Sequence, residues 1–461
     1  NTFRRLFAEG TFNAAFVPSY SSELNKGKSK ANKFANEIFN ILFMGLLFCV
    51  LIAQIFMPAF VSLIAPGFIE SSEKIKLATD LTRITFPFLM FVSLSSFFSA
   101  ILNSHNKFAA ASASPIILNV VLIIVLLLSK FLNDSLVYYL SYGVSLAGLF
   151  QLIFLYKFVK RFYSINLKFK FNKNKQVSIF FKKLLPSIFS SGVTQINIFV
   201  GTIIASFQAS AVSYLYYADR IYQINLAIAG IAIGVVVLPQ LSKYVYYKKK
   251  EKIIFMQNKA LELSMFLSIP AALALIIGSE EIISGLFGYG SFSEEAVSNS
   301  AKALYYFSFG LPAFALIKVF STFFFANHDT KTPFYISLFS VILNILISVY
   351  YFEKLGFIII PIATSISSWF NSIILYLYLK NKDLFNFNKI FISRFVKILI
   401  ASFLMGLFFN YLIILLANKL VYDYNLKSLY LILSVFLGFA FYILVSFFIK
   451  AFNYKDVKLK Y

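Results

Sequence analysis

The sequence predicts an all-α polytopic membrane protein, and three observations carry that prediction. Hydrophobic residues make up 59% of the 461 residues, and the mean hydropathy is +0.79. Apolar runs recur along the whole chain, and their length of about 18 to 25 residues is what a helix needs to cross a bilayer about 30 Å thick. The sequence also lacks the period-two alternation typical of a transmembrane barrel.

Thirteen helical spans can be placed along the chain. They cover residues 3–20, 34–64, 79–102, 109–130, 135–158, 184–208, 217–241, 257–284, 300–325, 333–352, 356–379, 394–417 and 427–449. Lysine-rich loops, such as residues 26–33 and 243–259, alternate with loops that carry glutamates, such as Glu70 and Glu294. Because cytoplasmic loops collect Lys and Arg, we expect the basic side to be cytoplasmic, with Asn1 outside and the tail inside.

Matching residues recur at a nearly constant offset, which indicates an internal repeat. The pairs are Pro18 and Pro239, 221 apart; Pro87 and Pro312, 225 apart; His105 and His328, 223 apart; and Asn119 and Asn344, 225 apart. The offset crosses six spans, an even number, so the two copies have the same orientation and are related by an axis along the membrane normal.

The repeat predicts the domain organisation. We expect an N-terminal lobe at residues 1–165, a C-terminal lobe at residues 166–385, and two additional transmembrane helices with a tail at residues 386–461. The second copy opens with a helix near 184–208, whereas no equivalent helix precedes Arg4. One further helix is therefore expected upstream, which would give two six-helix lobes plus two helices, or fourteen spans, in the intact protein.

Charge and cysteine usage exclude several classes of function. The formal charge of +23 is spread over alternate loops, so it indicates membrane topology and not a nucleic-acid partner. Cys49 is the single cysteine and the two histidines are far apart, so we expect no disulfide, metal site or cofactor. No soluble segment is long enough for an ATPase domain. A transporter rather than an enzyme is predicted, driven by an ion gradient, the membrane potential or the substrate's own gradient.

Ionisable residues within the spans are the candidate functional residues, because a charge at membrane depth costs about 3 kcal/mol or more. Arg5 and Glu9 are four residues apart and are expected to pair along one helix face. Arg4 is rotated by about 100° from Arg5 and lacks such a partner, so we expect it to present its charge to a cavity.

Four further polar residues within the spans are candidates on the same grounds. Asp219 and Arg220 are adjacent, so their side chains point in different directions and are expected to find partners on other helices. Lys318 lies near the cytoplasmic end of its span, and both a cavity role and simple snorkelling to the interface stay open. Asn344 is expected to form a hydrogen bond between helices.

Several segments carry a resemblance to a known family. They are RRLFAEGTFNAAFVPSYSSEL at 4–24, APGF at 65–68, ITFPFL at 84–89, YYADR at 216–220, LPQLSK at 238–243, FGYGSF at 287–292 and HDTKTP at 328–333. In these segments, and nearly from end to end, the chain resembles the MurJ (also called MviN) family of lipid II flippases. That family acts in bacterial peptidoglycan synthesis and belongs to the multidrug/oligosaccharidyl-lipid/polysaccharide superfamily.

The resemblance implies a multi-pass protein of the bacterial cytoplasmic membrane that moves lipid II from the inner to the outer leaflet by alternating access. It implies two lobes around a central cavity and a groove for the polyprenyl tail on the two C-terminal helices. The resemblance carries over Arg4, Glu9, Asp219 and Arg220, and Lys318 completes the candidate substrate-binding set. Planar guanidinium groups suit a diphosphate because they bind it bidentately.

The resemblance leaves partners and alternatives open. Some family members bind sodium in the C-terminal lobe; Asn344 matches that pattern, but Ser348 stands where an acidic residue is expected. Sodium or another ion, and the cell-wall synthesis machinery, therefore stay open as partners. The alternative function is another exporter of the superfamily, either an O-antigen-type lipid-linked oligosaccharide flippase or a multidrug antiporter. A glycosyltransferase is opposed by the short outer loops, and a membrane scaffold stays open.

Overall fold

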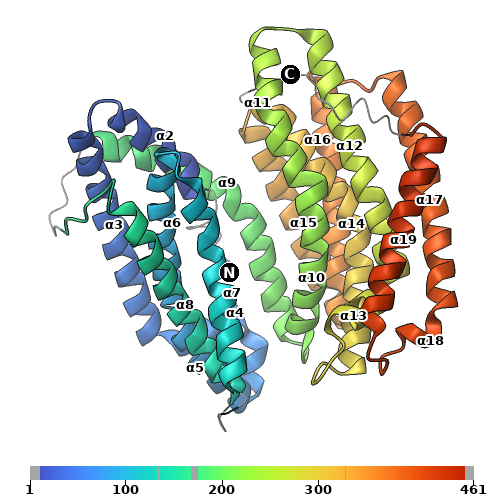
Figure 1. Ribbon diagram of the computed structural model, residues 1–461, viewed down its shortest axis with the longest axis horizontal. Coiled ribbons are helices and arrows are strands. Elements are labelled where there is room, and N and C mark those ends of the chain that lie inside the picture. The colour runs from blue at the N-terminus through green and yellow to red at the C-terminus, as the bar shows by residue number, and fades with distance from the viewer. Residues whose placement is uncertain (1–10, 130, 132–134, 168–174, 328, 452–461) are drawn as a thin grey trace. The chain divides into compact units, whose positions relative to one another are not determined.

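The computed structural model describes residues 11–129, 131, 135–167, 175–327 and 329–451, and all regular elements in these ranges are helices (Figure 1). Contacts divide the chain into two compact units, residues 1–207 and residues 208–461. The lobe boundaries predicted at 165/166 and 385/386 come from the internal sequence repeat and not from contacts between residues, and they stay predictions.

The first unit contains helices α2 to α9. Their bounds are α2 (Thr11–Leu24), α3 (Lys28–Ile55), α4 (Met57–Ile64), the 3-10 helix η1 (Pro66–Glu70), α5 (Ser72–Thr85), α6 (Phe88–Ser104), α7 (Phe108–Ser129), α8 (Leu136–Val159) and α9 (Lys175–Ser206). α6 packs against α8, and α2 packs against α6 and α9. The predicted span at 79–102 is divided at Pro87, which lies between α5 and α6.

The second unit contains helices α10 to α19. Their bounds are α10 (Ala211–Leu226), the π-helix η2 (Ala227–Ala232), α11 (Ile233–Tyr246), α12 (Lys250–Ile277), α13 (Ser279–Phe287), α14 (Glu294–Ala326), α15 (Lys331–Leu355), the 3-10 helix η3 (Gly356–Ile358), α16 (Ile359–Asn381), α17 (Lys389–Leu415), α18 (Ala417–Leu420) and α19 (Lys427–Phe448). α14 lies between α10, α12 and α16, and α17 packs against α19.

The expectation of a polytopic membrane protein is confirmed. Within the described ranges, nine helical stretches are long and apolar enough to cross a membrane, and one of them, Lys331–Asn381, contains both α15 and α16. Large apolar side chains lie on the outside of these helices, as shown by Phe448, which is 78% exposed, and Tyr350, which is 72% exposed. Such a surface suits lipid rather than water.

Phenylalanine rings form the core of the first unit. Phe16 of α2 and Phe97 of α6 are both fully buried, and their ring centroids lie 5.1 Å apart. Phe180 of α9 meets Phe16 edge to face at 6.1 Å. Because each aromatic ring buries about 150–250 Å² and prefers such tilted or edge-on contacts, these rings fix α2 against its neighbours.

One hydrogen-bond arrangement occurs in both units and supports the predicted repeat. In α3, Asn36 accepts a bond from the backbone N–H of Asn166 at 2.7 Å. In α12, Asn258 accepts one from the backbone N–H of Asn388 at 3.1 Å. Both pairs are 130 residues apart, and the two asparagines are 222 residues apart in the sequence. The offset agrees with that of the sequence pairs, although His328 lies outside the described residues.

The APGF segment brings η1 into direct contact with the end of α9. The backbone N–H of Gly67 donates to the hydroxyl of Ser206 at 3.0 Å. A Cβ atom at Gly67 would lie 2.2 Å from the carbonyl oxygen of Ser206. Only glycine fits here, because the clashing atom belongs to the backbone of Ser206 and cannot move away by a change of side-chain rotamer.

Gly67→Ala is therefore expected to destabilise the protein by about 1–3 kcal/mol through overpacking. The measurement is the thermal unfolding of the purified protein in detergent. Gly45→Ala is the matched control, because a Cβ atom at Gly45 in α3 meets nothing within 4 Å and alanine favours a helix. Equal midpoints for the two variants would show that the contact with Ser206 is not tight.

Candidate substrate-binding site

The faces of α10 place Arg220 away from the core of the second unit. Ala218, Ile221 and Tyr222 are buried, and the ring of Tyr222 lies 5.6 Å from Phe307 and 5.5 Å from Phe314 of α14. Two helical positions separate Arg220 from Tyr222, which is a rotation of about 200°. Arg220 thus lies on the side of α10 opposite its buried face.

Arg220 is held by its own helix. Its guanidinium carbon lies 4.5 Å from the ring centroid of Tyr216, one turn earlier. The Nε atom of Arg220 is buried and has no hydrogen-bond partner. Stacking uses the face of the guanidinium and leaves its edge, which carries the N–H donors, unused by the ring. An unpartnered buried N–H is rare in proteins and calls for an explanation.

Asp219 is engaged separately from Arg220. The side-chain amide of Gln223, one turn later, donates to the Asp219 carboxylate. The partners described here, Gln223 and Tyr216, lie on α10 itself, and the expectation of partners on other helices stays a prediction.

Lys318 belongs to α14 and is not brought to Arg220. It is an exposed residue of its helix, and its Cγ atom lies 3.3 Å from the position of a Cβ atom at Gly230. Gly230 belongs to the π-helix η2 and follows Arg220 by ten positions, which corresponds to about 15 Å along a helix. Lys318 thus forms a second cationic position further along the same pair of helices.

The π-helix interrupts the predicted span at 217–241. Such segments occur mostly as single turns and often at functional sites. Gly230 permits this turn to approach α14 closely, because a Cβ atom there would lie 3.3 Å from the Cα atom of Ala315. The π-helix η2, which directly follows the helix that carries Arg220, thus packs against the part of α14 that carries Lys318.

Arg4 and Glu9 lie outside the described residues. Their place in the candidate substrate-binding set therefore stays a prediction. Sequence reasoning did not single out Tyr216 or Gln223, which the structure shows beside Arg220 and Asp219. The available signal was their spacing, since each lies four residues from its charged partner and therefore on the same helix face.

The polar cluster around Asn344 was the candidate for a sodium site. Its amide nitrogen donates to Thr364 at 3.0 Å and to Ser367 at 3.3 Å, and the Ser348 hydroxyl donates to its amide oxygen at 3.3 Å. A hard cation requires converging oxygen ligands, but here the amide presents its nitrogen to two hydroxyl groups. The cluster fits hydrogen bonding between α15 and α16, as predicted for Asn344, rather than a cation site.

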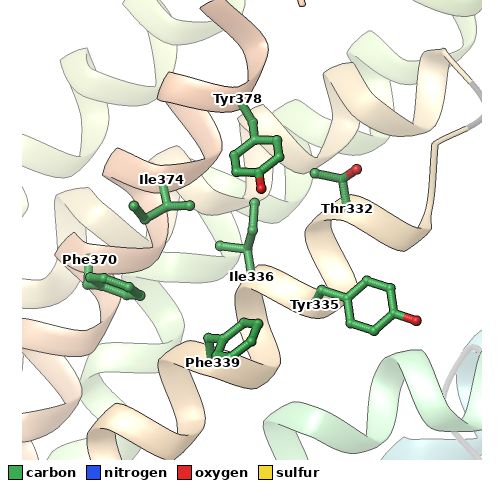
Figure 2. Close-up of a pocket in the computed structure, with 7 residues that line it drawn as sticks. All are labelled: Thr332, Tyr335, Ile336, Phe339, Phe370, Ile374 and Tyr378. Carbon is green, nitrogen blue, oxygen red and sulfur yellow. The ribbon is translucent and has the colours of Figure 1, made fainter. Parts of the chain in front are cut away.

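An apolar groove lies between α15 and α16, with a volume of about 220 Å³ (Figure 2). It is lined by Thr332, Tyr335, Ile336, Phe339, Phe370, Ile374 and Tyr378. Figure 2 shows the rings of Phe339 and Phe370 at the end away from Thr332 and Tyr378. No charged side chain lines the groove, so it suits hydrocarbon and not an anionic group.

Comparison with known proteins places the chain in one family. The family described as Lipid II flippase MurJ matches residues 1–436. The chain belongs to the MurJ family of lipid II flippases. A Rickettsia prowazekii relative, named a probable lipid II flippase MurJ, is 39% identical over 385 residues, which are 82% of this chain and 74% of the relative. A Rhizobium tropici relative of the same name is 38% identical over 386 residues, 82% of this chain and 72% of the relative.

Solved structures agree with the MurJ assignment. A structure described as lipid II flippase MurJ in an inward closed conformation matches with a TM-score of 0.79 and 26% identity, covering 99% of this chain and 90% of that one. An inward-facing multidrug resistance MATE transporter matches with a TM-score of 0.69 and 16% identity, covering 83% and 88%. The second likeness shows a shared fold alone. The chain is thus a multi-pass membrane transporter of the MurJ family, as the resemblance implied.

Proposed function

We propose that this protein moves lipid II from the inner to the outer leaflet of the bacterial cytoplasmic membrane by alternating access, for peptidoglycan synthesis. The observation that carries the proposal is the state of Arg220, which is stacked on Tyr216 and has a buried Nε without a partner. A guanidinium in this state is prepared for two oxygens of a diphosphate, which it binds bidentately.

The chemistry of lipid II explains why a cationic site is needed. Its sugar and peptide head group and its diphosphate cannot enter hydrocarbon without losing their hydrogen bonds to water, which costs several kcal/mol for each unpaired group. A polar site that takes up the head while the polyprenyl chain stays in the bilayer removes that cost. Arg220 supplies the charge that holds the diphosphate, and Asp219 accepts a hydrogen bond from Gln223.

Lys318 adds a second cation further along the same helices. It is exposed, and the stem of its side chain packs beside Gly230. Its ammonium can therefore attract the anionic group of the substrate before or after that group binds Arg220.

We assign no ATPase to the chain, and the driving gradient, a coupling ion and contacts with the cell-wall synthesis machinery stay predictions. The rival function, a multidrug antiporter, would need a carboxylate to bind a cationic drug, whereas Arg220 carries a positive charge.

The test is complementation of a bacterium depleted of its lipid II flippase by the full-length gene. We expect growth to be restored and lipid II to become accessible to a membrane-impermeant reagent added outside the cell. An O-antigen-type flippase mutant serves as the parallel strain. Rescue of that strain alone, or survival without externally accessible lipid II, would overturn the proposal.

A further inference from the structure

Lys427, the first residue of α19, is a buried cation without a carboxylate. It is 1% exposed, and no ion pair involves it among the residues that the structure describes. Its ammonium donates to the carbonyl oxygen of Gly288 at 2.6 Å and to that of Tyr422. The ring centroids of Tyr289 and Tyr422 both lie 4.4 Å from the Nζ atom. These four groups form the Lys427 cage.

The position of this lysine is not explained by helix stability. A cation at the start of a helix is opposed by the helix dipole, and a buried ammonium must replace its lost hydration with other partners. The cage provides them through two carbonyl oxygens and two aromatic faces, an arrangement that strengthens when water is excluded. All four groups lie outside α19, and two of them belong to residues 288 and 289, so the lysine holds together segments that are distant in the sequence.

The segment held by the cage is the FGYGSF turn at residues 287–292. Besides the bonds to Lys427, the Tyr422 hydroxyl donates to the carbonyl of Phe292 at 2.6 Å. The hydroxyl groups of Tyr289 and Ser428 lie 2.5 Å apart. Both ends of the turn are therefore attached to the start of α19 and the loop before it.

The turn in turn contacts the helix that carries Arg220. The ring of Tyr217 lies 4.9 Å from the ring of Phe287 and 4.8 Å from that of Phe292. Tyr217 follows Tyr216, the residue on which Arg220 is stacked. The contacts are thus continuous from Lys427 through the FGYGSF turn to the first turns of α10.

We propose that Lys427 is a positioning residue for substrate capture, which holds the FGYGSF turn against Tyr217 and so fixes the orientation of Arg220. This inference rests on the proposed function, since it concerns the same anion site. It also gives the C-terminal helix α19 a role in head-group binding that does not involve contact with the substrate.

The central variant is Lys427→Met, which keeps an unbranched side chain but removes the ammonium. In vesicles containing the purified full-length protein and lipid II, we expect the half-saturating lipid II concentration to rise about tenfold. The maximal rate should stay within about twofold of wild type. Lys427→Arg keeps the charge and should restore part of the loss. Backbone amides at 286–292 and 211–220 should exchange hydrogen faster in Lys427→Met.

Lys419→Met is the matched control. Lys419 lies 4.9 Å from the ring of Tyr424 and donates to its hydroxyl at 3.3 Å, but it is exposed, and the partner described for it is Tyr424 rather than a residue of the FGYGSF turn. It should leave both readouts unchanged. Tyr422→Phe keeps the ring over Lys427 and loses the bond to Phe292, so it should shift both readouts in the same direction by less, and it replaces Lys427→Met if that variant fails to fold.

A wild-type half-saturating concentration in the cage variants would overturn the inference. So would faster exchange at 286–292 that does not extend to 211–220, because the turn would then not hold α10. Failure of the wild-type protein to move lipid II would instead overturn the proposed function, and the exchange at 211–220 would still decide whether Lys427 fixes α10.

Discussion

Arg220→Ala is expected to lower lipid II translocation about 100-fold, while the amount of protein in the membrane stays close to that of wild type. Hydrogen bonds to charged groups contribute about 1.5–3 kcal/mol each, and two of them to one diphosphate correspond to two or more factors of ten in affinity at about 1.4 kcal/mol per factor. Folding should survive, because Arg220 lies on the side of α10 away from the buried Tyr222.

Two further variants separate charge from geometry at this position. Arg220→Lys should recover only part of the rate, since an ammonium is a hydrated point charge and cannot bind two oxygens with a planar fork. Tyr216→Leu removes the ring beneath the guanidinium but keeps the charge, so its rate should fall between those of wild type and Arg220→Ala. Translocation and membrane protein level are measured together. Wild-type translocation by Arg220→Ala would refute the assignment of this arginine to the diphosphate.

Arg4→Ala is expected to resemble Arg220→Ala if the two arginines hold the diphosphate from opposite lobes. Arg5→Ala is the contrast, because Glu9 would lose its partner on the same helix face and the main effect should fall on stability. Equal loss of protein in all three variants would make these arginines structural ion pairs.

Glu262→Gln is expected to lower the free energy of unfolding by about 3–5 kcal/mol, the cost of breaking a buried ion pair by removing one partner. Glu262 of α12 has only 4% of its side chain exposed, and it lies 2.9 Å from the ammonium of Lys259. Both of its carboxylate oxygens accept hydrogen bonds from Arg394 of α17 at 3.0 Å. Without the carboxylate, Lys259 and Arg394, whose side chains are 11% and 23% exposed, lose the anion that they share.

Glu23→Gln is the matched control for this prediction. Glu23 also pairs with a lysine three positions away, Lys26 at 2.6 Å, but Lys26 is 44% exposed. Water takes over the solvation of such a lysine, so the loss should stay below about 1 kcal/mol. Both variants are compared by thermal unfolding in the same detergent. Similar losses would show that burial of the α12–α17 ion pair is not what gives Glu262 its importance.

The sequence anticipated much of the site but not how it is held. It selected Asp219 and Arg220 because charges within apolar spans are rare and costly. It also placed FGYGSF among the family segments. It did not reveal that Gln223 donates a hydrogen bond to Asp219 or that the ring of Tyr216 lies against the guanidinium of Arg220. Nor did it reveal that Lys318 lies beside Gly230. Nor did it mark Lys427, which stands at the start of a predicted span where a lysine is ordinary.

The sequence by itself determined that the chain crosses a membrane many times and where most of its helices lie, and it predicted an internal repeat. These conclusions depend on local apolar length and on regular spacing, which are properties of consecutive residues. Only the tertiary structure decided the ion pair of Glu262 with Arg394, the close contact of Gly67 with Ser206, and the Lys427 cage. Each joins residues more than 100 positions apart, and their partners are set by the packing of helices rather than by any pattern within one helix.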